Sequence, residues 1–263
     1  MQIFFRTLLA IFLAHLLADF VFQTDRLVAT KRAGKWFGYL LHGLIHYFSA
    51  LVLLGFFVKG TALSFKTYAV LLLLTAVHLL IERAKIRLTT VGFLHDSSLA
   101  YLADQFVHFL TVLLTAWILA PGLAFSQLSQ PIGSLRSLET KWLAVPIIYV
   151  AVVFGGGYLI RYLTRNLSEG LKNNHTEKAT EQLQNAGLYI GWLERFLVVT
   201  ALLLQSPATV GLILTAKSIA RYPEFKSERF AEYFLIGTLL SISIAIVGGA
   251  ILAKLLLGLV KFS

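Results

Sequence analysis

Long apolar stretches alternate with short polar ones along the whole chain. The stretches are close to the about 20 residues that a helix needs to cross ~30 Å of hydrocarbon, and they recur many times. The pattern predicts an all-α, polytopic integral membrane helical bundle of about eight transmembrane helices. We expect them at residues 3–23, 36–58, 67–83, 99–121, 142–163, 188–205, 207–222 and 232–258.

The sixth and seventh expected helices are short and flank Gln205-Ser206-Pro207. This arrangement is typical of a tight helical hairpin, which need not cross the full bilayer. Six transmembrane helices plus a re-entrant hairpin are therefore the alternative to eight.

The longest polar stretch, residues 164–187, predicts a short surface helix in a cytoplasmic loop and divides the chain. We expect a four-helix membrane bundle over residues 1–122, a fifth helix and polar loop over 123–187, and a C-terminal three-helix region with a basic cluster over 188–263. No cleavable signal peptide is expected, because the first apolar run is full length and carries His15 and Asp19.

Composition supports a membrane protein, since 57% of the residues are hydrophobic and only 14% are charged. The absence of cysteine excludes disulfides, thiolate zinc sites and iron–sulfur clusters. The net charge of +10 does not indicate nucleic-acid binding, because the basic residues collect in short loops between apolar runs. The loops 24–35, 83–98, 161–187 and 217–232 hold fifteen Lys and Arg against seven on the other side, which predicts cytoplasmic loops and both termini outside.

Each of the first four expected helices carries two potential metal ligands four residues apart, a spacing that places both on one helix face. The pairs are His15 and Asp19, His42 and His46, His78 and Glu82, and Asp104 and His108. In the predicted topology all eight lie at a similar depth, about 6 to 15 Å from the cytoplasmic interface. They can therefore meet in one site.

The cost of burying charge also indicates a metal. Three carboxylates inside membrane helices each cost a few kcal/mol unless a partner compensates them. A divalent cation would neutralise the acids and take neutral imidazoles as further ligands. A structural hydrogen-bond network, haem and a proton relay are the alternatives.

Eight candidate ligands exceed the four of a closed zinc site, so we expect a binuclear centre of zinc, manganese or iron with open positions. Glu82 and Asp104 are the candidates for a catalytic general base. At the cytoplasmic mouth, Gln23, Asp25 and Asp96 are candidates for binding a substrate head group, although Asp25 and Asp96 are equally compatible with solvated loop residues.

Three strings carry a resemblance to a known family: His15-Leu-Leu-Ala-Asp19-Phe20-Val-Phe-Gln23, Leu41-His42-Gly43 to His46, and Asp104-Gln-Phe-Val-His108. They resemble a bacterial membrane family known as domain of unknown function 3307, over about the first 120 residues. The resemblance implies a bacterial inner-membrane protein but no activity. A looser similarity, in residue types alone, is to membrane-bound metal-dependent hydrolases.

A second charged cluster lies in the last three expected helices. Arg195, Lys217 and Arg221 predict a pocket for a phosphate or carboxylate beside the metal. The alternative is a set of basic residues that reach the interface and pair with Glu194 and Glu232.

These features favour a metal-dependent hydrolase acting on an amphiphilic or phosphorylated substrate at the cytoplasmic leaflet. No Gly-x-Ser-x-Gly, phosphate-binding glycine loop or His-Glu-x-x-His motif supports it, so it is inferred from ligand types. A transporter or channel that binds a cation or relays protons is the first alternative. A di-iron membrane oxidase is the second.

Overall fold

The computed structural model describes residues 2–58, 64–95, 97–120, 138–165, 177–222, 225 and 228–257. Over these residues the protein is all-α, without a strand. The chain divides into two compact units, Met1–Ile147 and Ile148–Ser263, and each is described by itself.

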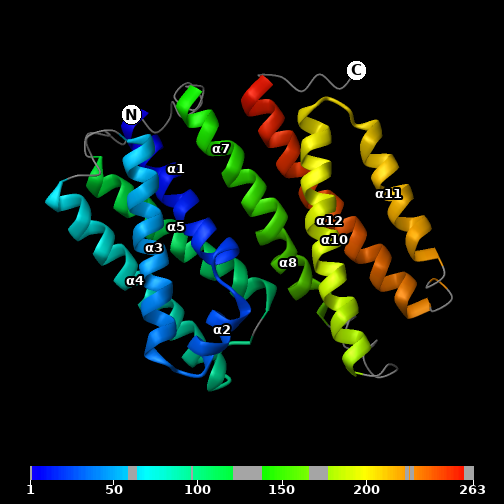
Figure 1. Ribbon diagram of the computed structural model, residues 1–263, viewed down its shortest axis with the longest axis horizontal. Helices are drawn as coiled ribbons and strands as arrows, with labels where there is room; N and C mark the ends of the chain where they lie inside the picture. The colour runs from blue at the N-terminus through cyan, green and yellow to red at the C-terminus, as the bar shows by residue number, and fades with distance from the viewer. Residues whose placement is uncertain are drawn as a thin grey trace. The chain divides into compact units, whose positions relative to one another are not determined.

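The first unit is a ring of four long helices (Figure 1). Helix α1 packs against α3 and α5, and α4 packs against the same two helices, so the four surround a common axis. The bounds are α1 Gln2–Leu16, continued by a π-helical turn η1 Leu17–Val21, then α3 Trp36–Phe57, α4 Phe65–Thr90 and α5 Ser98–Leu119.

The ring is apolar on its outer surface, as a helix bundle in lipid requires. On α3, Phe48 and Val52 are exposed, and on α5 Phe106 and Leu114 are exposed. Five histidines are buried inside the ring, among apolar residues such as Ile11, Leu54 and Leu71. A soluble bundle has the same apolar interior but a polar outer surface, so the apolar outer surface is what distinguishes this ring.

A short helix that the sequence pattern did not predict closes one end of this ring. Helix α2, Asp25–Arg32, begins at Thr24, whose side chain caps the Leu27 amide. It packs against α3, where Gly38 permits the contact, because a Cβ at that position would lie 3.0 Å from the Thr30 methyl group. The close approach tucks the Lys31 side chain into the bundle.

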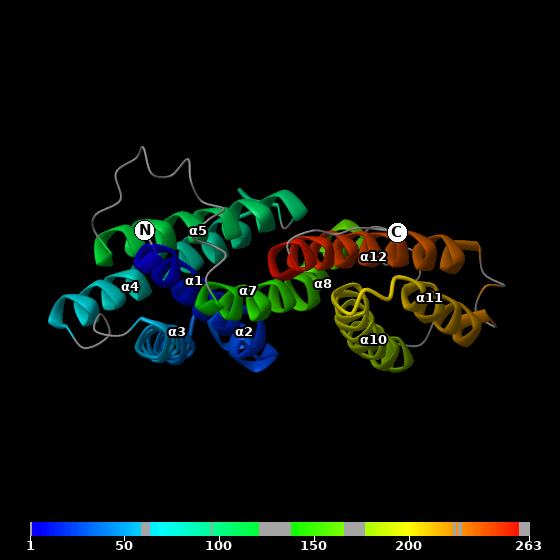
Figure 2. The ribbon, with the colours of Figure 1, turned by 90° about the horizontal axis from the view of Figure 1, so that it is seen from above.

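The second unit begins inside the helix Leu138–Val150, whose residues up to Ile147 belong to the first unit, and contains the helices that follow. Helix α7 Leu138–Val150 continues through a π-helical turn η3 Ala151–Gly155 into α8 Gly156–Leu163, and is followed by α10 Glu177–Leu203, α11 Ala208–Arg221 and α12 Glu228–Leu257. Helices α10 and α12 are close neighbours, and α11 packs on α10 (Figure 2). Gly248 permits a close contact within the unit, since a Cβ there would lie 2.3 Å from the Val152 side chain.

Five helical segments in the described chain are long and apolar enough to cross a membrane: Gln2–Val21, Trp36–Phe57, Ser98–Leu119, Thr140–Leu163 and Phe230–Leu257. They coincide with the first, second, fourth, fifth and eighth expected helices. The other three expected helices also exist, as α4, α10 and α11, but they are more polar or, for α11 with its 14 residues, shorter than a span. The count of eight transmembrane helices thus stays a prediction.

The polar stretch 164–187 differs from its prediction. Its final part is not a separate surface helix, because α10 runs without interruption from Glu177 to Leu203. No proline interrupts this segment, so the helix continues from the polar stretch into the apolar one. Residues 166–176 lie outside the described part of the chain.

Candidate metal centre

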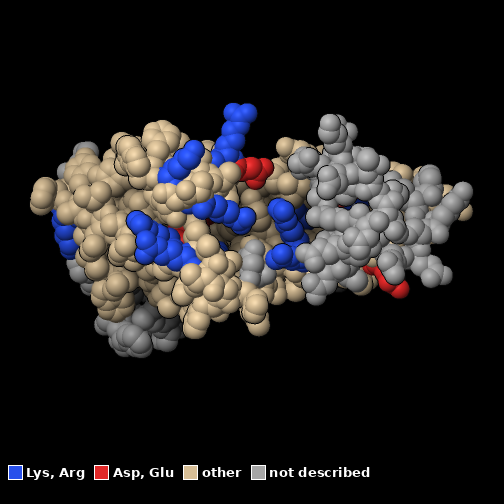
Figure 3. All heavy atoms as spheres, turned by 90° about the horizontal axis from the view of Figure 1, so that it is seen from below, with Lys and Arg blue, Asp and Glu red and all other residues tan. Residues whose placement is uncertain are grey.

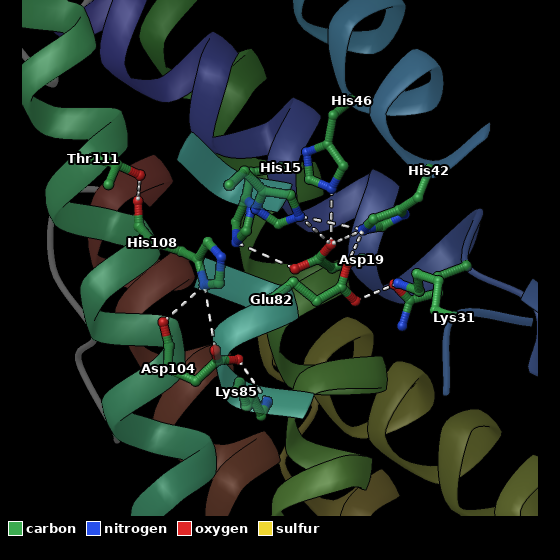
Figure 4. A network of polar contacts seen from close by, with 12 residues as sticks. His15, Asp19, Lys31, His42, His46, Glu82, Lys85, Asp104, His108 and Thr111 are labelled. Atoms are coloured by element: carbon green, nitrogen blue, oxygen red, sulfur yellow. Dashed lines mark hydrogen bonds and ion pairs between the residues drawn. The ribbon is translucent and has the colours of Figure 1, made fainter. Parts of the chain in front are cut away.

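The buried histidines converge on the Asp19 carboxylate, near the α2 end of the ring (Figure 4). Its Oδ1 lies 2.8 Å from His46 Nε2, 3.3 Å from His42 Nε2 and 3.6 Å from His78 Nε2. His15 Nε2 lies 3.6 Å from the other oxygen, Oδ2. The imidazoles of three helices thus surround one carboxylate of η1.

The π-helical turn contributes to the position of Asp19. In a π-turn each N–H bonds to the carbonyl five residues earlier, as the Phe22 amide does to Leu17. The wider turn rotates the residues after Leu16 relative to an α-helix. His15 and Asp19, four residues apart, nevertheless remain neighbours, with His15 Nε2 3.6 Å from Asp19 Oδ2.

The distances suit a divalent ion. A tetrahedral zinc with ligands at about 2.0–2.1 Å sets its ligand atoms about 3.4 Å apart. Four ligand atoms, from His15, Asp19, His46 and His78, all lie within 4.8 Å of one another, and we name these residues the Asp19 group. A second set, His42, His78 and Glu82, meets the same limit and is named the Glu82 group.

Several polar atoms in the cluster have no hydrogen-bond partner, which is costly in a buried site unless a ligand is bound. They are His15 Nε2, His42 Nδ1, His78 Nδ1, His108 Nε2 and Glu82 Oε2. His42 and His78 approach Asp19 through Nε2, so the unpartnered atoms that count as available ligands are His15 Nε2, His108 Nε2 and Glu82 Oε2. These three atoms fit a metal on an observation that is independent of ligand spacing.

His108 is oriented by its own helix. Its Nδ1 donates a hydrogen bond to the Asp104 carbonyl at 2.9 Å, which leaves the lone pair on the buried Nε2. The ring lies 4.4 Å from the His78 ring and 5.1 Å from the His15 ring, centroid to centroid. His108 thus lies against the Asp19 group, and the lone pair on its Nε2 is suited to bind a metal.

Two lysines pair with the remaining carboxylates, and neither pair was predicted from the sequence. Lys31 donates to Glu82, and also to Gln23 Oε1 at 2.8 Å. Lys85 donates to the Asp104 carboxylate at 2.8 Å. Both lysines lie in segments that the sequence predicts as loops, although Lys85 follows Glu82 by three residues, a spacing that keeps it on the same helix face.

These ion pairs reduce the number of buried carboxylates that need a metal ion to compensate their charge. Three carboxylates in the cluster meet two ammonium groups, so only Asp19 lacks a cationic side chain among its described partners. One divalent ion then suffices to compensate the site.

The cluster adjoins a small cavity of about 20 Å³, room for one water molecule. His15, His46 and His78 line one side of it. The other side is mainly apolar, and its residues are Ile11, Ala14, Ala50, Leu74, Thr75, Thr111 and Val112.

The residues predicted at the mouth are placed differently from one another. Gln23 accepts a hydrogen bond from Lys31 and so belongs to the cluster's edge. Asp25 is exposed at the first position of α2. Asp96 lies outside the described residues. The α2 end of the ring is basic, with Arg26, Arg32 and Arg87 exposed, and Lys and Arg side chains gather on the face seen in Figure 3.

The predicted anion-binding residues lie in the second unit and have separate partners. Arg195 is buried and donates to the Val153 carbonyl through two nitrogens, at 2.8 and 3.0 Å, and to Ser241 at 3.1 Å. Lys217 pairs with Glu194 at 2.6 Å, as the alternative interpretation expected. Arg221 is partly exposed in the last turn of α11. Arg195 and Lys217 share no hydrogen-bond partner among the described contacts, although Glu194, which pairs with Lys217, also interacts electrostatically with Arg195.

Comparison with known proteins bears on the first unit alone. Residues 7–132 match the model of a family described as "Protein of unknown function (DUF3307)", which confirms the resemblance seen in the three sequence strings. No curated protein and no solved structure matches the chain.

Proposed function

Residues 7–132 belong to a family whose description assigns no activity, and we propose from the site itself that this protein is a membrane-embedded, metal-dependent hydrolase. The observation that carries the proposal is the Asp19 group, four ligands from three helical segments within 4.8 Å of one another in a buried site. We assign to it one divalent ion, of zinc, manganese or iron.

A divalent ion in this group would supply a Lewis acid that polarises a carbonyl or phosphoryl group and activates water. Glu82 is suited to accept a proton, because its Oε2 makes no hydrogen bond and lies 3.6 Å from His42 Nε2. Lys31 holds the other oxygen and so orients the carboxylate. Asp104 orients His108 through its backbone carbonyl, while its carboxylate pairs with Lys85 and belongs to neither group of potential ligands.

The substrate class follows from the surroundings of the site. The ring has an apolar surface, and the end nearest the cluster carries exposed Arg26, Arg32 and Arg87. An amphiphilic substrate with a phosphate or carboxylate head group would match both. We place this end at the cytoplasmic leaflet of a bacterial inner membrane, because the most basic loops lie there.

Metal content measures the proposal directly. Protein purified in detergent without chelators is expected to hold one divalent ion per chain by elemental analysis. Asp19→Asn and His46→Ala should lose it. The matched controls are Asp25→Asn and His95→Ala, which change an exposed acid and an exposed imidazole of the same unit and should retain the ion.

Activity is the second readout. Phospholipid and acyl-lipid hydrolysis should be lost in Asp19→Asn together with the metal, whereas Glu82→Gln should lose activity and keep the ion. An intact, monodisperse protein with no bound metal would refute the centre. Two irons with a visible absorption band would instead favour the di-iron oxidase.

Cation transport is a second candidate, and one observation favours it. The polar side chains form a continuous row from Lys31 and Glu82 through the histidines to Asp104 and Lys85 (Figure 4). Such a row could relay a proton or pass a cation. Uptake of the bound metal or of protons into vesicles that contain the protein separates this function from hydrolysis.

A further inference from the structure

The two groups of potential ligands overlap at one residue, His78. The Asp19 group and the Glu82 group both include it, and each satisfies the 4.8 Å limit by itself. The same nitrogen, His78 Nε2, faces both groups, since it lies 3.6 Å from Asp19 Oδ1 and 3.2 Å from His42 Nε2. Because one imidazole nitrogen ligates one ion at a time, the cluster offers two alternative positions for an ion.

Lys31 distinguishes the two positions. Its side chain is 1% exposed, and its ammonium donates to one oxygen of Glu82. An ion in the Glu82 group would lie next to that ammonium and be repelled by it. In the Asp19 group, an ion meets a carboxylate with no lysine among its described contacts.

The backbone leaves Lys31 little freedom to withdraw. A Cβ on Gly38 would lie 3.1 Å from the Lys31 amide nitrogen and 3.2 Å from its Cγ, so α3 closely covers the base of this side chain. At the other end of the side chain, the Nζ ammonium donates to Gln23 Oε1 at 2.8 Å, in addition to its bond to Glu82. Both contacts hold the ammonium against Glu82.

We propose that the cluster contains a second, latent metal position formed by His42, His78 and Glu82, and that the Lys31 ammonium occupies the place of its cation. Lys31 thereby directs the ion to the Asp19 group. This inference rests on the proposed metal centre, and it assigns Lys31 the role of a positioning residue.

Lys85 provides a matched comparison. It pairs with Asp104 at 2.8 Å, as Lys31 pairs with Glu82, and it lies on the same face of α4 as Glu82. Among the potential metal ligands, the described contacts of the Asp104 carboxylate include His108 alone, at 3.7 Å, and Asp104 belongs to neither group. Removal of Lys85 should therefore expose a carboxylate without creating a metal position.

The test is a rescue of metal binding by the loss of a lysine. Detergent-solubilised protein is titrated with Zn²⁺ for affinity and with Co²⁺ for the absorption bands that report its ligands. Wild type should bind one ion, and Asp19→Asn should weaken Zn²⁺ binding by more than about 100-fold, since loss of an outer partner alone costs about 10–100-fold. Asp19→Asn/Lys31→Met should restore one ion to within about tenfold of wild-type affinity, with a changed Co²⁺ spectrum.

Two further variants define the restored site. Adding Glu82→Gln to the rescued protein should abolish binding again, and Asp19→Asn/Lys85→Met should not bind. Circular dichroism and gel filtration establish that each variant is folded.

The failures of the two proposals are distinguishable. No ion in folded wild type refutes the metal centre and this inference with it. One ion in wild type and none in Asp19→Asn/Lys31→Met overturns the latent position and leaves the centre intact. Two ions in wild type, binding by Asp19→Asn alone, or rescue by Lys85→Met also overturn the inference.

Discussion

Replacing Lys31 by Met should expose the energetic cost of the cluster's buried charge. Met retains an unbranched apolar chain but removes the ammonium, which leaves the Glu82 carboxylate, 17% exposed, without its cation. Breaking a buried ion pair from one side costs about 3–5 kcal/mol, because the remaining charge is uncompensated. The free energy of unfolding should fall by that amount in Lys31→Met.

Removing both charges should cost much less than the sum of the single changes. In Lys31→Met/Glu82→Gln no buried charge is left unpaired, so we expect the double variant to recover at least about 2 kcal/mol relative to additivity. The measurement is denaturant unfolding in detergent, followed by circular dichroism, with a chelator present so that bound metal does not contribute. Arg32→Met changes an exposed neighbour and should stay within about 0.5 kcal/mol of wild type.

A cost below about 1 kcal/mol for Lys31→Met, or strict additivity, would refute this reasoning. Either result would mean that water or a head group solvates Glu82 in place of the lysine. The pair would then be a surface ion pair in energetic terms.

Three further outcomes follow from other contacts. Asp104→Asn should change Zn²⁺ affinity by less than about tenfold in an isothermal titration, because the backbone carbonyl that accepts the His108 hydrogen bond stays in place. A loss of about 10–100-fold would instead make the Asp104 carboxylate an outer partner of the centre. Arg195→Met should lower the free energy of unfolding by about 2–4 kcal/mol, because it removes the three hydrogen bonds that the guanidinium donates to the Val153 carbonyl and Ser241. A thermal melt with no shift would contradict this. Gly248→Ala should lower the free energy of unfolding by about 1–3 kcal/mol, because the new Cβ would overpack against Ile148 and Val152. Gly237→Ala places its Cβ with no atom within 4 Å and should be neutral or stabilising. Equal melting temperatures of the two variants would refute this reasoning.

The sequence was sufficient to predict the four long helices of the first unit and the gathering of their histidines. Runs of about 20 apolar residues fix the helices, and inward-pointing polar residues in lipid require partners, so the His and carboxylate pairs had to face one another. The close grouping of His15, Asp19, His46 and His78 is the structural form of that expectation. Its occupation by metal stays a prediction.

Other features depended on tertiary contacts that no local pattern encodes. Lys31 lies in a short polar segment that resembles a loop, and only its packing under α3 makes it buried. The sequence nevertheless contained a signal, because Thr24 is a favoured N-cap and Leu27 and Lys31 lie four residues apart. Arg195 was similarly interpreted by charge alone, whereas a π-helical carbonyl of η3 is its partner.

The two π-helical turns make chain length, as well as residue identity, part of the design of this protein. A π-turn holds one more residue than an α-turn, and successive helical residues are rotated by about 100°. Deleting one residue from Leu17–Val21 would let α1 continue as a regular helix while the cluster side chains of α3, α4 and α5 stayed in place. The angle between His15 and Asp19 would change, and α2 with Lys31 would be drawn one residue closer to α1. Relatives that retain the ligands but lack this extra residue would have to place their carboxylate by another route.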